Sequence, residues 1–230
     1  MELRIKHKKI LISVWLNGGD KNILLAGGLP QYVTKYHPLV KMAEEASINL
    51  FVPRYMGSWE SGGTFSVKNC VKTVEETIRL IRNGKGEELY GNSSVSWNSE
   101  KIYLVGFSFG GFPALLNEES VTKTILVNPF VNLILQKKFK GEDIEETLRF
   151  LKRAYANMYR FDFAEVIKDL ISLKYPEKKD KLVLVRGVND KTIPKEQIDW
   201  ISAKYNPIYI EIPGGHSLNF TKELFEKVSG

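Results

Sequence analysis

Cysteine and histidine are scarce in this sequence of 230 residues, and the shortage of cysteine excludes two kinds of site. The one cysteine, Cys70, can form neither an internal disulfide nor a cysteine-rich metal site. It falls on the apolar face of a predicted helix, so we expect a buried thiol that packs as a small hydrophobic group. Only three histidines are present, and any site that needs an imidazole must choose among them.

Long apolar runs are also missing. The run from Ile10 to Leu16 is short, contains Ser13, and has no small-residue cleavage site after it. It is therefore more typical of a strand than of a signal peptide. No stretch is long enough to span a bilayer, so we expect a cytoplasmic protein with no membrane partner.

Clustered positive charge is a third absence, although the formal net charge is +6 and the isoelectric point is about 9.2. Lysine and arginine are dispersed among many acidic residues, and no basic run is longer than residues 6–9. No nucleic-acid-binding motif is present, so we expect no nucleic acid partner. The length and the even composition predict one domain over residues 1–230.

Short apolar segments alternate along the chain with segments of helical periodicity, which predicts an α/β fold. The segment 3–16 predicts two antiparallel strands, and further strands are expected at 23–26, 48–52, 101–105, 121–127, 182–186 and 208–212. Helices are expected at 38–46, 67–81, 112–116 and 218–228, and an exposed polar connection at 83–99.

The segment 141–173 is a helical insertion beyond a minimal sheet. Its apolar residues form one predicted stripe, made of Ile144, Leu148, Leu151, Tyr155 and Met158. Acidic residues precede basic ones along it, as the helix dipole favours. The insertion is either a small cap over a site or a helix that packs on the sheet edge.

The sequence Gly106-Phe107-Ser108-Phe109-Gly110 lies between a predicted strand and a predicted helix, which is the nucleophile-elbow pattern. The turn holds the serine in a strained backbone conformation and crowds the residues on either side, where glycine is needed. The pattern therefore predicts that Ser108 is a nucleophile and that the Phe109 N–H can face a developing negative charge.

A second pair of glycines, Gly27 and Gly28, ends the strand at 23–26. In enzymes with a nucleophile elbow, the corresponding loop supplies the second oxyanion donor, which makes the N–H of Gly28 or Leu29 a candidate. A plain turn between strand and loop is the alternative interpretation.

Two further residues that an activated serine needs also follow predicted strands. Asp190 lies in the loop after 182–186, and His216 follows two glycines after 208–212. The carboxyl ends of parallel strands meet at one sheet edge, so these side chains are expected beside Ser108. His216 would take the serine proton and Asp190 would hold its ring, and the chain order Ser, Asp, His is the one expected for an elbow.

Aromatic residues near these loops are candidates for substrate contact. Phe107 flanks the serine, and Tyr55 and Trp59 lie in a glycine-rich loop after the strand at 48–52. Loops at this end of a parallel sheet carry function. Covering the core is the alternative role for Tyr55 and Trp59.

Taken together, these motifs resemble the α/β-hydrolase superfamily from residue 26 to residue 216. The doubled glycine of 106–111, the run 187–194 and Gly214-Gly215-His216 are similar to the branch of dienelactone-hydrolase-like esterases and prolyl-oligopeptidase-type catalytic domains. The resemblance implies a mostly parallel eight-stranded sheet with helices on both faces, a Ser108 nucleophile, and neither metal nor organic cofactor. Ala26 stands where that family has a histidine.

These observations predict a serine hydrolase that cleaves carboxylic esters or thioesters of modest size through an acyl-enzyme intermediate. Its partner would be a small acyl substrate. Two alternatives stay open at this point: a peptidase or aminopeptidase-like amidase, and a hydrolase-fold protein that binds a ligand without catalysis.

Overall fold

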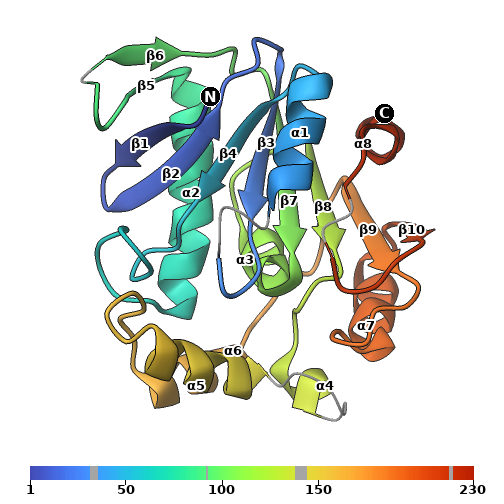
Figure 1. Cartoon of the computed structure of the whole chain (residues 1–230). Coiled ribbons are helices and arrows are strands. Elements are labelled where there is room, and N and C mark those ends of the chain that lie inside the picture. Colours follow the sequence, from blue (N-terminus) through green and yellow to red (C-terminus); the bar gives the residue numbers. More distant parts are fainter. Residues whose placement is uncertain (32–35, 92, 138–143, 218–219) are drawn as a thin grey trace.

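The computed structural model describes residues 1–31, 36–91, 93–137, 144–217 and 220–230 (Figure 1). The strands of the main sheet are β1 (Leu3–His7), β2 (Ile10–Trp15), β3 (Lys21–Ala26), β4 (Asn49–Pro53), β7 (Lys101–Phe107), β8 (Lys123–Val127), β9 (Leu182–Gly187) and β10 (Ile208–Ile212). The α-helices are α1 (His37–Glu45), α2 (Val67–Asn83), α3 (Gly111–Leu116), α4 (Leu133–Lys137), α5 (Ile144–Ala154), α6 (Phe163–Ile171), α7 (Lys195–Tyr205) and α8 (Lys222–Ser229).

The sheet has eight strands in the order β1-β2-β4-β3-β7-β8-β9-β10. Strand β2 is antiparallel to both of its neighbours, and the pairs from β4 through β10 are parallel. The mostly parallel eight-stranded sheet expected from the sequence is therefore confirmed. Strands β3, β7, β9 and β10 end at the same edge, and the loops that leave this edge carry the candidate site residues (Figure 1).

Side chains alternate between the two faces of the sheet, as the strand period requires. On β3, Leu24 packs in the cluster under α2 and α7, whereas its neighbour Leu25 packs in the cluster under α1 and α8. The valines and isoleucines of the central strands are almost wholly buried because helices cover both faces. This arrangement confirms helices on both faces and holds the loop ends on a rigid base.

Helix α2 begins at an N-cap, Ser66, whose side chain accepts a hydrogen bond from the Asn69 N–H. It ends at Gly84, which has φ +68. Cys70 lies on its buried face, as predicted, and burial raises the pKa of the thiol well above its usual value. The thiol is therefore uncharged at neutral pH and packs as an apolar group.

Two expectations need correction. The polar segment 83–99 is exposed as expected, with no buried residue among those described, but it is not only a connection: β5 (Lys85–Glu87) and β6 (Ser94–Ser96) pair in it as a small antiparallel hairpin. The last helix begins at Lys222 rather than at Leu218, and residues 218–219 lie outside the described part of the chain. Among the described residues, no helix has the length and apolar content needed to cross a membrane.

Candidate active site

The turn after β7 has the backbone conformation expected of an elbow. Ser108 has φ +51, in the left-handed region that non-glycine residues seldom adopt. A short 3-10 turn, Ser108–Gly110, then leads into α3. A Cβ added at Gly110 would lie 1.8 Å from the Ala26 carbonyl oxygen, and one added at Gly106 would lie 2.7 Å from the Gly110 oxygen. Only glycine therefore allows this turn to pack against the end of β3.

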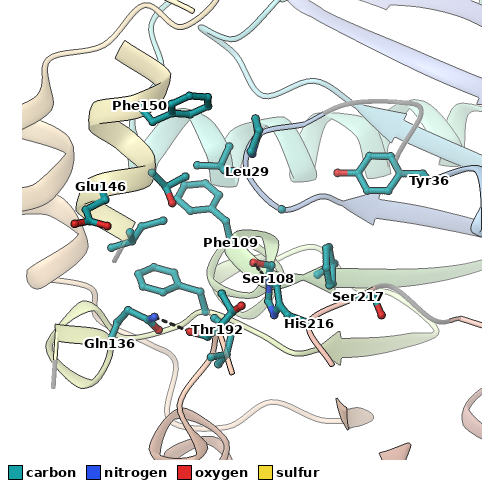
Figure 2. Close-up of a pocket in the computed structure, with 17 residues that line it drawn as sticks. Leu29, Tyr36, Ser108, Phe109, Gln136, Glu146, Phe150, Thr192, His216 and Ser217 are labelled. Carbon is teal, nitrogen blue, oxygen red and sulfur yellow. Dashed lines mark hydrogen bonds between the residues drawn. The ribbon is translucent and has the colours of Figure 1, made fainter. Parts of the chain in front are cut away.

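The three side chains that the sequence predicted to converge lie in hydrogen-bonding contact. The His216 Nε2 atom lies 2.9 Å from the Ser108 hydroxyl oxygen, and its Nδ1 atom lies 2.9 Å from Asp190 Oδ2. The Asp190 side chain is 1% exposed and that of His216 is 20% exposed. Figure 2 shows Ser108 and His216 meeting beside the pocket. The imidazole therefore bridges a buried carboxylate and a hydroxyl that lines the cavity.

Burial and four polar interactions act in opposite directions on the pKa of the Asp190 carboxyl group. Burial favours its neutral form, but the hydrogen bond and charge of His216 and the N–H groups of Ile193 and Thr192 favour the carboxylate. The two N–H groups donate to Oδ1 over 3.1 and 2.7 Å. The balance lowers the pKa of Asp190, so this residue is a carboxylate at neutral pH and accepts a hydrogen bond from the His216 Nδ1–H.

Asn128, which the sequence analysis did not identify, connects the loops of Asp190 and His216. It follows β8, is fully buried and has φ +44. Its Oδ1 accepts the Gly187 N–H over 2.8 Å, and its Nδ2 donates to the Gly215 carbonyl over 3.2 Å. An asparagine directly after a buried strand, at the edge where the site was expected, is the signal that could have identified it.

The loop after β3 reaches the serine. A Cβ added at Gly28 would lie 3.0 Å from the Ser108 Cβ atom. Gly28, Leu29 and Phe109 all line the cavity that contains the Ser108 hydroxyl. The structure thus brings the three candidate oxyanion residues to the predicted nucleophile, with Gly28 directly against it.

A cavity of about 640 Å³ opens beside Ser108. Its apolar wall includes Leu29, Phe107, Phe109, Phe130, Ile144 and Ile193. The Phe107 ring, which the sequence predicted to contact substrate, stacks on His216 with the ring centroids 5.3 Å apart. Polar side chains, among them those of Tyr36, Glu146 and Gln136, form the other part of the lining, and the Gln136 Nε2 donates to the Thr192 carbonyl (Figure 2). The cavity thus combines an apolar wall with polar side chains beside the Ser108 hydroxyl.

Two predicted substrate contacts are wrong. Tyr55 is fully buried, and its hydroxyl donates to the Gly27 carbonyl rather than facing the cavity. Trp59 packs against Tyr155 and Tyr159, at centroid distances of 5.5 and 6.1 Å, and does not line the cavity either. The alternative, that both rings cover the core, is the correct one.

The insertion consists of two helices where the sequence predicted one stripe, and residues 141–143 lie outside the described part of the chain. Helix α5 ends at Ala154, and Met158 is 41% exposed, so the predicted stripe does not continue that far. Ile144, Thr147 and Phe150 of α5 line the cavity, and Figure 2 shows Phe150 on this helix. This contact favours a cap over a helix that only packs on the sheet edge.

Side chains that commonly bind metal ions do not gather in one place in the described part of the chain. No group of three or more His, Cys, Asp or Glu side chains is arranged there to hold a metal ion.

No protein-family model matches the chain, and no curated protein matches it in sequence. Solved structures match it over nearly its whole length. Est1E of Butyrivibrio proteoclasticus, solved with ferulic acid bound, has a TM-score of 0.65 at 14% identity, with 99% of this chain and 96% of that one covered.

Two further esterases give the same result. An esterase of Exiguobacterium antarcticum has a TM-score of 0.63 at 14% identity, with both chains wholly covered (100% and 100%). An esterase of Pyrococcus furiosus has a TM-score of 0.62 at 15% identity, with 100% of this chain and 90% of that one covered. The chain therefore has the α/β-hydrolase fold.

Proposed function

We propose that this protein is a serine hydrolase that cleaves carboxylic esters or thioesters with Ser108, His216 and Asp190. The observation that carries the proposal is the unbroken pair of contacts from the Ser108 hydroxyl through the imidazole to the buried Asp190 carboxylate. A serine hydroxyl is a weak nucleophile until a base removes its proton, and His216 is placed to do so.

In the proposed acylation step, Ser108 Oγ bonds to the carbonyl carbon while His216 Nε2 takes the hydroxyl proton. The carbonyl π electrons move onto the oxygen, which becomes negative. The N–H of Phe109 and that of Gly28 or Leu29 would stabilise this oxyanion, and one such donor is typically worth about 3 kcal/mol of barrier. The tetrahedral centre then expels the alkoxide or thiolate, which takes the proton from His216.

Deacylation repeats the sequence with water as the nucleophile. His216 takes a proton from water as the oxygen attacks the acyl carbon, and it returns that proton to Ser108 Oγ when the ester bond to the enzyme breaks. The Asp190 carboxylate stabilises the imidazolium in both steps because its lowered pKa keeps it charged.

The apolar wall of the cavity, which includes Phe109, Phe130 and Ile144, supports an apolar acyl or alcohol group of modest size. The esterases among the similar structures also favour esters over peptides. Helix α5, which lines the same cavity, would act as a small cap over the bound substrate.

The test is covalent labelling of the folded protein by a fluorophosphonate, followed by mass spectrometry of the tryptic peptides. We expect one adduct, on Ser108, and hydrolysis of acyl nitrophenyl esters that Ser108→Ala abolishes. Faster turnover of aminoacyl nitroanilides than of esters would favour the peptidase alternative. The absence of both adduct and turnover would favour a ligand-binding protein.

A further inference from the structure

A buried hydroxyl lies directly behind the loop that faces Ser108. The Tyr55 hydroxyl donates to the Gly27 carbonyl oxygen over 2.9 Å, and no part of the residue is exposed. The same side chain touches the other candidate oxyanion residue, since its ring packs edge-on against that of Phe109 with centroids 5.9 Å apart. Tyr55 therefore contacts both halves of the proposed oxyanion hole from the protein side.

The orientation of one peptide unit follows from this hydrogen bond. The peptide between Gly27 and Gly28 is trans, and in a planar trans peptide the C=O and N–H bonds point in opposite directions. Because the Gly27 carbonyl points towards the Tyr55 hydroxyl, the Gly28 N–H points away from it. Gly28 itself lies against Ser108, with a hypothetical Cβ only 3.0 Å from the Ser108 Cβ atom.

We infer that Tyr55 is a positioning residue for the oxyanion hole, and that the donor it orients is the N–H of Gly28 rather than that of Leu29. This inference rests on the proposed function, because an oxyanion forms only if Ser108 attacks a carbonyl. The inference therefore names the Gly28 amide as the donor where the sequence left Gly28 and Leu29 as alternatives.

Other contacts keep Tyr55 and its loop in this arrangement. The Gln31 Oε1 atom accepts the Tyr55 N–H over 3.2 Å, and the Gln31 N–H donates to the Tyr159 hydroxyl over 3.2 Å. Burial raises the pKa of Tyr55 well above its usual value, so its hydroxyl keeps its proton and stays a donor. Ala26 has no polar side chain that could orient the loop instead.

The first test is Tyr55→Phe, which removes the hydroxyl and keeps the ring that packs on Phe109. Loss of a whole oxyanion donor lowers kcat by about 100- to 1,000-fold. Tyr55→Phe keeps the Gly28 N–H and only removes the hydrogen bond that orients it, so kcat should fall less, by about 10- to 100-fold. We expect KM for a nitrophenyl ester to stay within about twofold. The serine adduct of phenylboronic acid places an oxygen in the oxyanion hole. The inhibition constant of this compound should therefore increase by a factor similar to the loss in kcat.

The matched control is Tyr175→Phe. This tyrosine is partly buried and its hydroxyl also donates to a backbone carbonyl, that of Val131. The control should lose thermal stability but keep kcat. Equal kcat for Tyr55→Phe and Tyr175→Phe, with both proteins folded at the assay temperature, would overturn the inference.

A second measurement needs no variant. Leu29 is the one leucine that follows a glycine in the sequence. In protein labelled with carbonyl-¹³C glycine and ¹⁵N leucine, its amide is therefore the one ¹⁵N bonded to a ¹³C carbonyl, which identifies its signal. The Gly28 amide is then assigned through this neighbour in ¹⁵N-glycine protein. On addition of phenylboronic acid, the Gly28 proton should move strongly downfield and the Leu29 proton should not.

The outcomes separate the inference from the function on which it rests. If the wild-type protein neither hydrolyses esters nor forms a boronate or fluorophosphonate adduct on Ser108, the proposed function fails and the inference falls with it. If the adduct forms but the Leu29 amide moves in place of the Gly28 amide, the hydrolase stands and the role given to Tyr55 is wrong.

Discussion

The strained backbone at Ser108 can be separated from its chemistry by two substitutions. Ser108→Ala and Ser108→Gly both remove the hydroxyl and its contact with His216 Nε2. Both should therefore reduce ester turnover to near background. They differ at the backbone, because Ser108 has φ +51 and only glycine adopts this conformation without a steric penalty.

The difference in stability follows from two opposing contributions. The left-handed conformation costs an L-residue roughly 1–2 kcal/mol. Glycine loses about 0.5–1 kcal/mol in additional chain entropy on folding. Ser108→Gly should therefore be more stable than Ser108→Ala by about 1 kcal/mol. For a protein of 230 residues this corresponds to about 2–4 °C in Tm.

Thermal and urea unfolding of the two variants at neutral pH measure this difference. The matched control is the pair Lys168→Ala and Lys168→Gly, at an exposed position inside α6. There the order should reverse, since glycine is about 1 kcal/mol less favourable than alanine in a helix. If Ser108→Gly were also the less stable of its pair, the argument that the elbow stores backbone strain would be refuted.

The remaining predictions concern the groups around the elbow. Asp190→Asn should lower kcat by about 10⁴-fold. Because folding lowers the pKa of Asp190, the carboxylate contributes to stability above its unfolded pKa of about 4, and this contribution is lost as the pH falls through the folded pKa. In Asp190→Asn, the free energy of unfolding measured by urea titration should therefore fall less steeply as the pH is lowered. Asn128→Ala should cost about 2–3 kcal/mol of unfolding free energy by urea titration, because it leaves a buried N–H unpaired, and a loss under about 1 kcal/mol would contradict this. Gly110→Ala should yield no folded protein by circular dichroism, since its methyl would meet the Ala26 carbonyl at 1.8 Å, whereas Gly62→Ala, with ordinary contacts of 3.5 Å and more, should fold.

The parts of the site that could be predicted from the sequence are those determined by short segments. An apolar strand followed by Gly-x-Ser-x-Gly implies the elbow, because a Cβ at Gly110 has no room there. The positions of Asp190 and His216 followed from a topological rule, that loops after parallel strands meet at one edge. These inferences need only the order of strands along the chain.

Tyr55 shows where such reasoning fails. An aromatic residue in a glycine-rich loop gives no local sign of whether its ring faces a cavity or the core. The decision depends on the Gly27 carbonyl, which is 28 residues earlier in the chain and accepts its hydroxyl. A partner so distant in sequence is visible only after β3 and β4 have paired.

The end of α5 illustrates the same limit. The apolar spacing continues to Met158, yet the helix ends at Ala154 because residues beyond it bond to the loop after β4. The Arg160 N–H donates to the Gly57 carbonyl, and the Phe65 N–H donates to the Arg160 carbonyl, each over 2.8 Å. Such bonds to a distant loop override helical periodicity, and periodicity alone cannot predict them.

Asn128 and Tyr55 share a physical feature that explains why the candidate site needs them. Each is a fully buried polar side chain that bonds to the backbone of a neighbouring loop, Asn128 to those of Asp190 and His216 and Tyr55 to that of Gly28. A backbone partner is present whatever side chains the loops carry, so loop sequences could vary while these bonds stay. Loss of either polar side chain would leave its buried backbone partner unpaired, which no change within the loop could repair. The geometry of the site should therefore depend more on these two residues than on most residues that line the cavity.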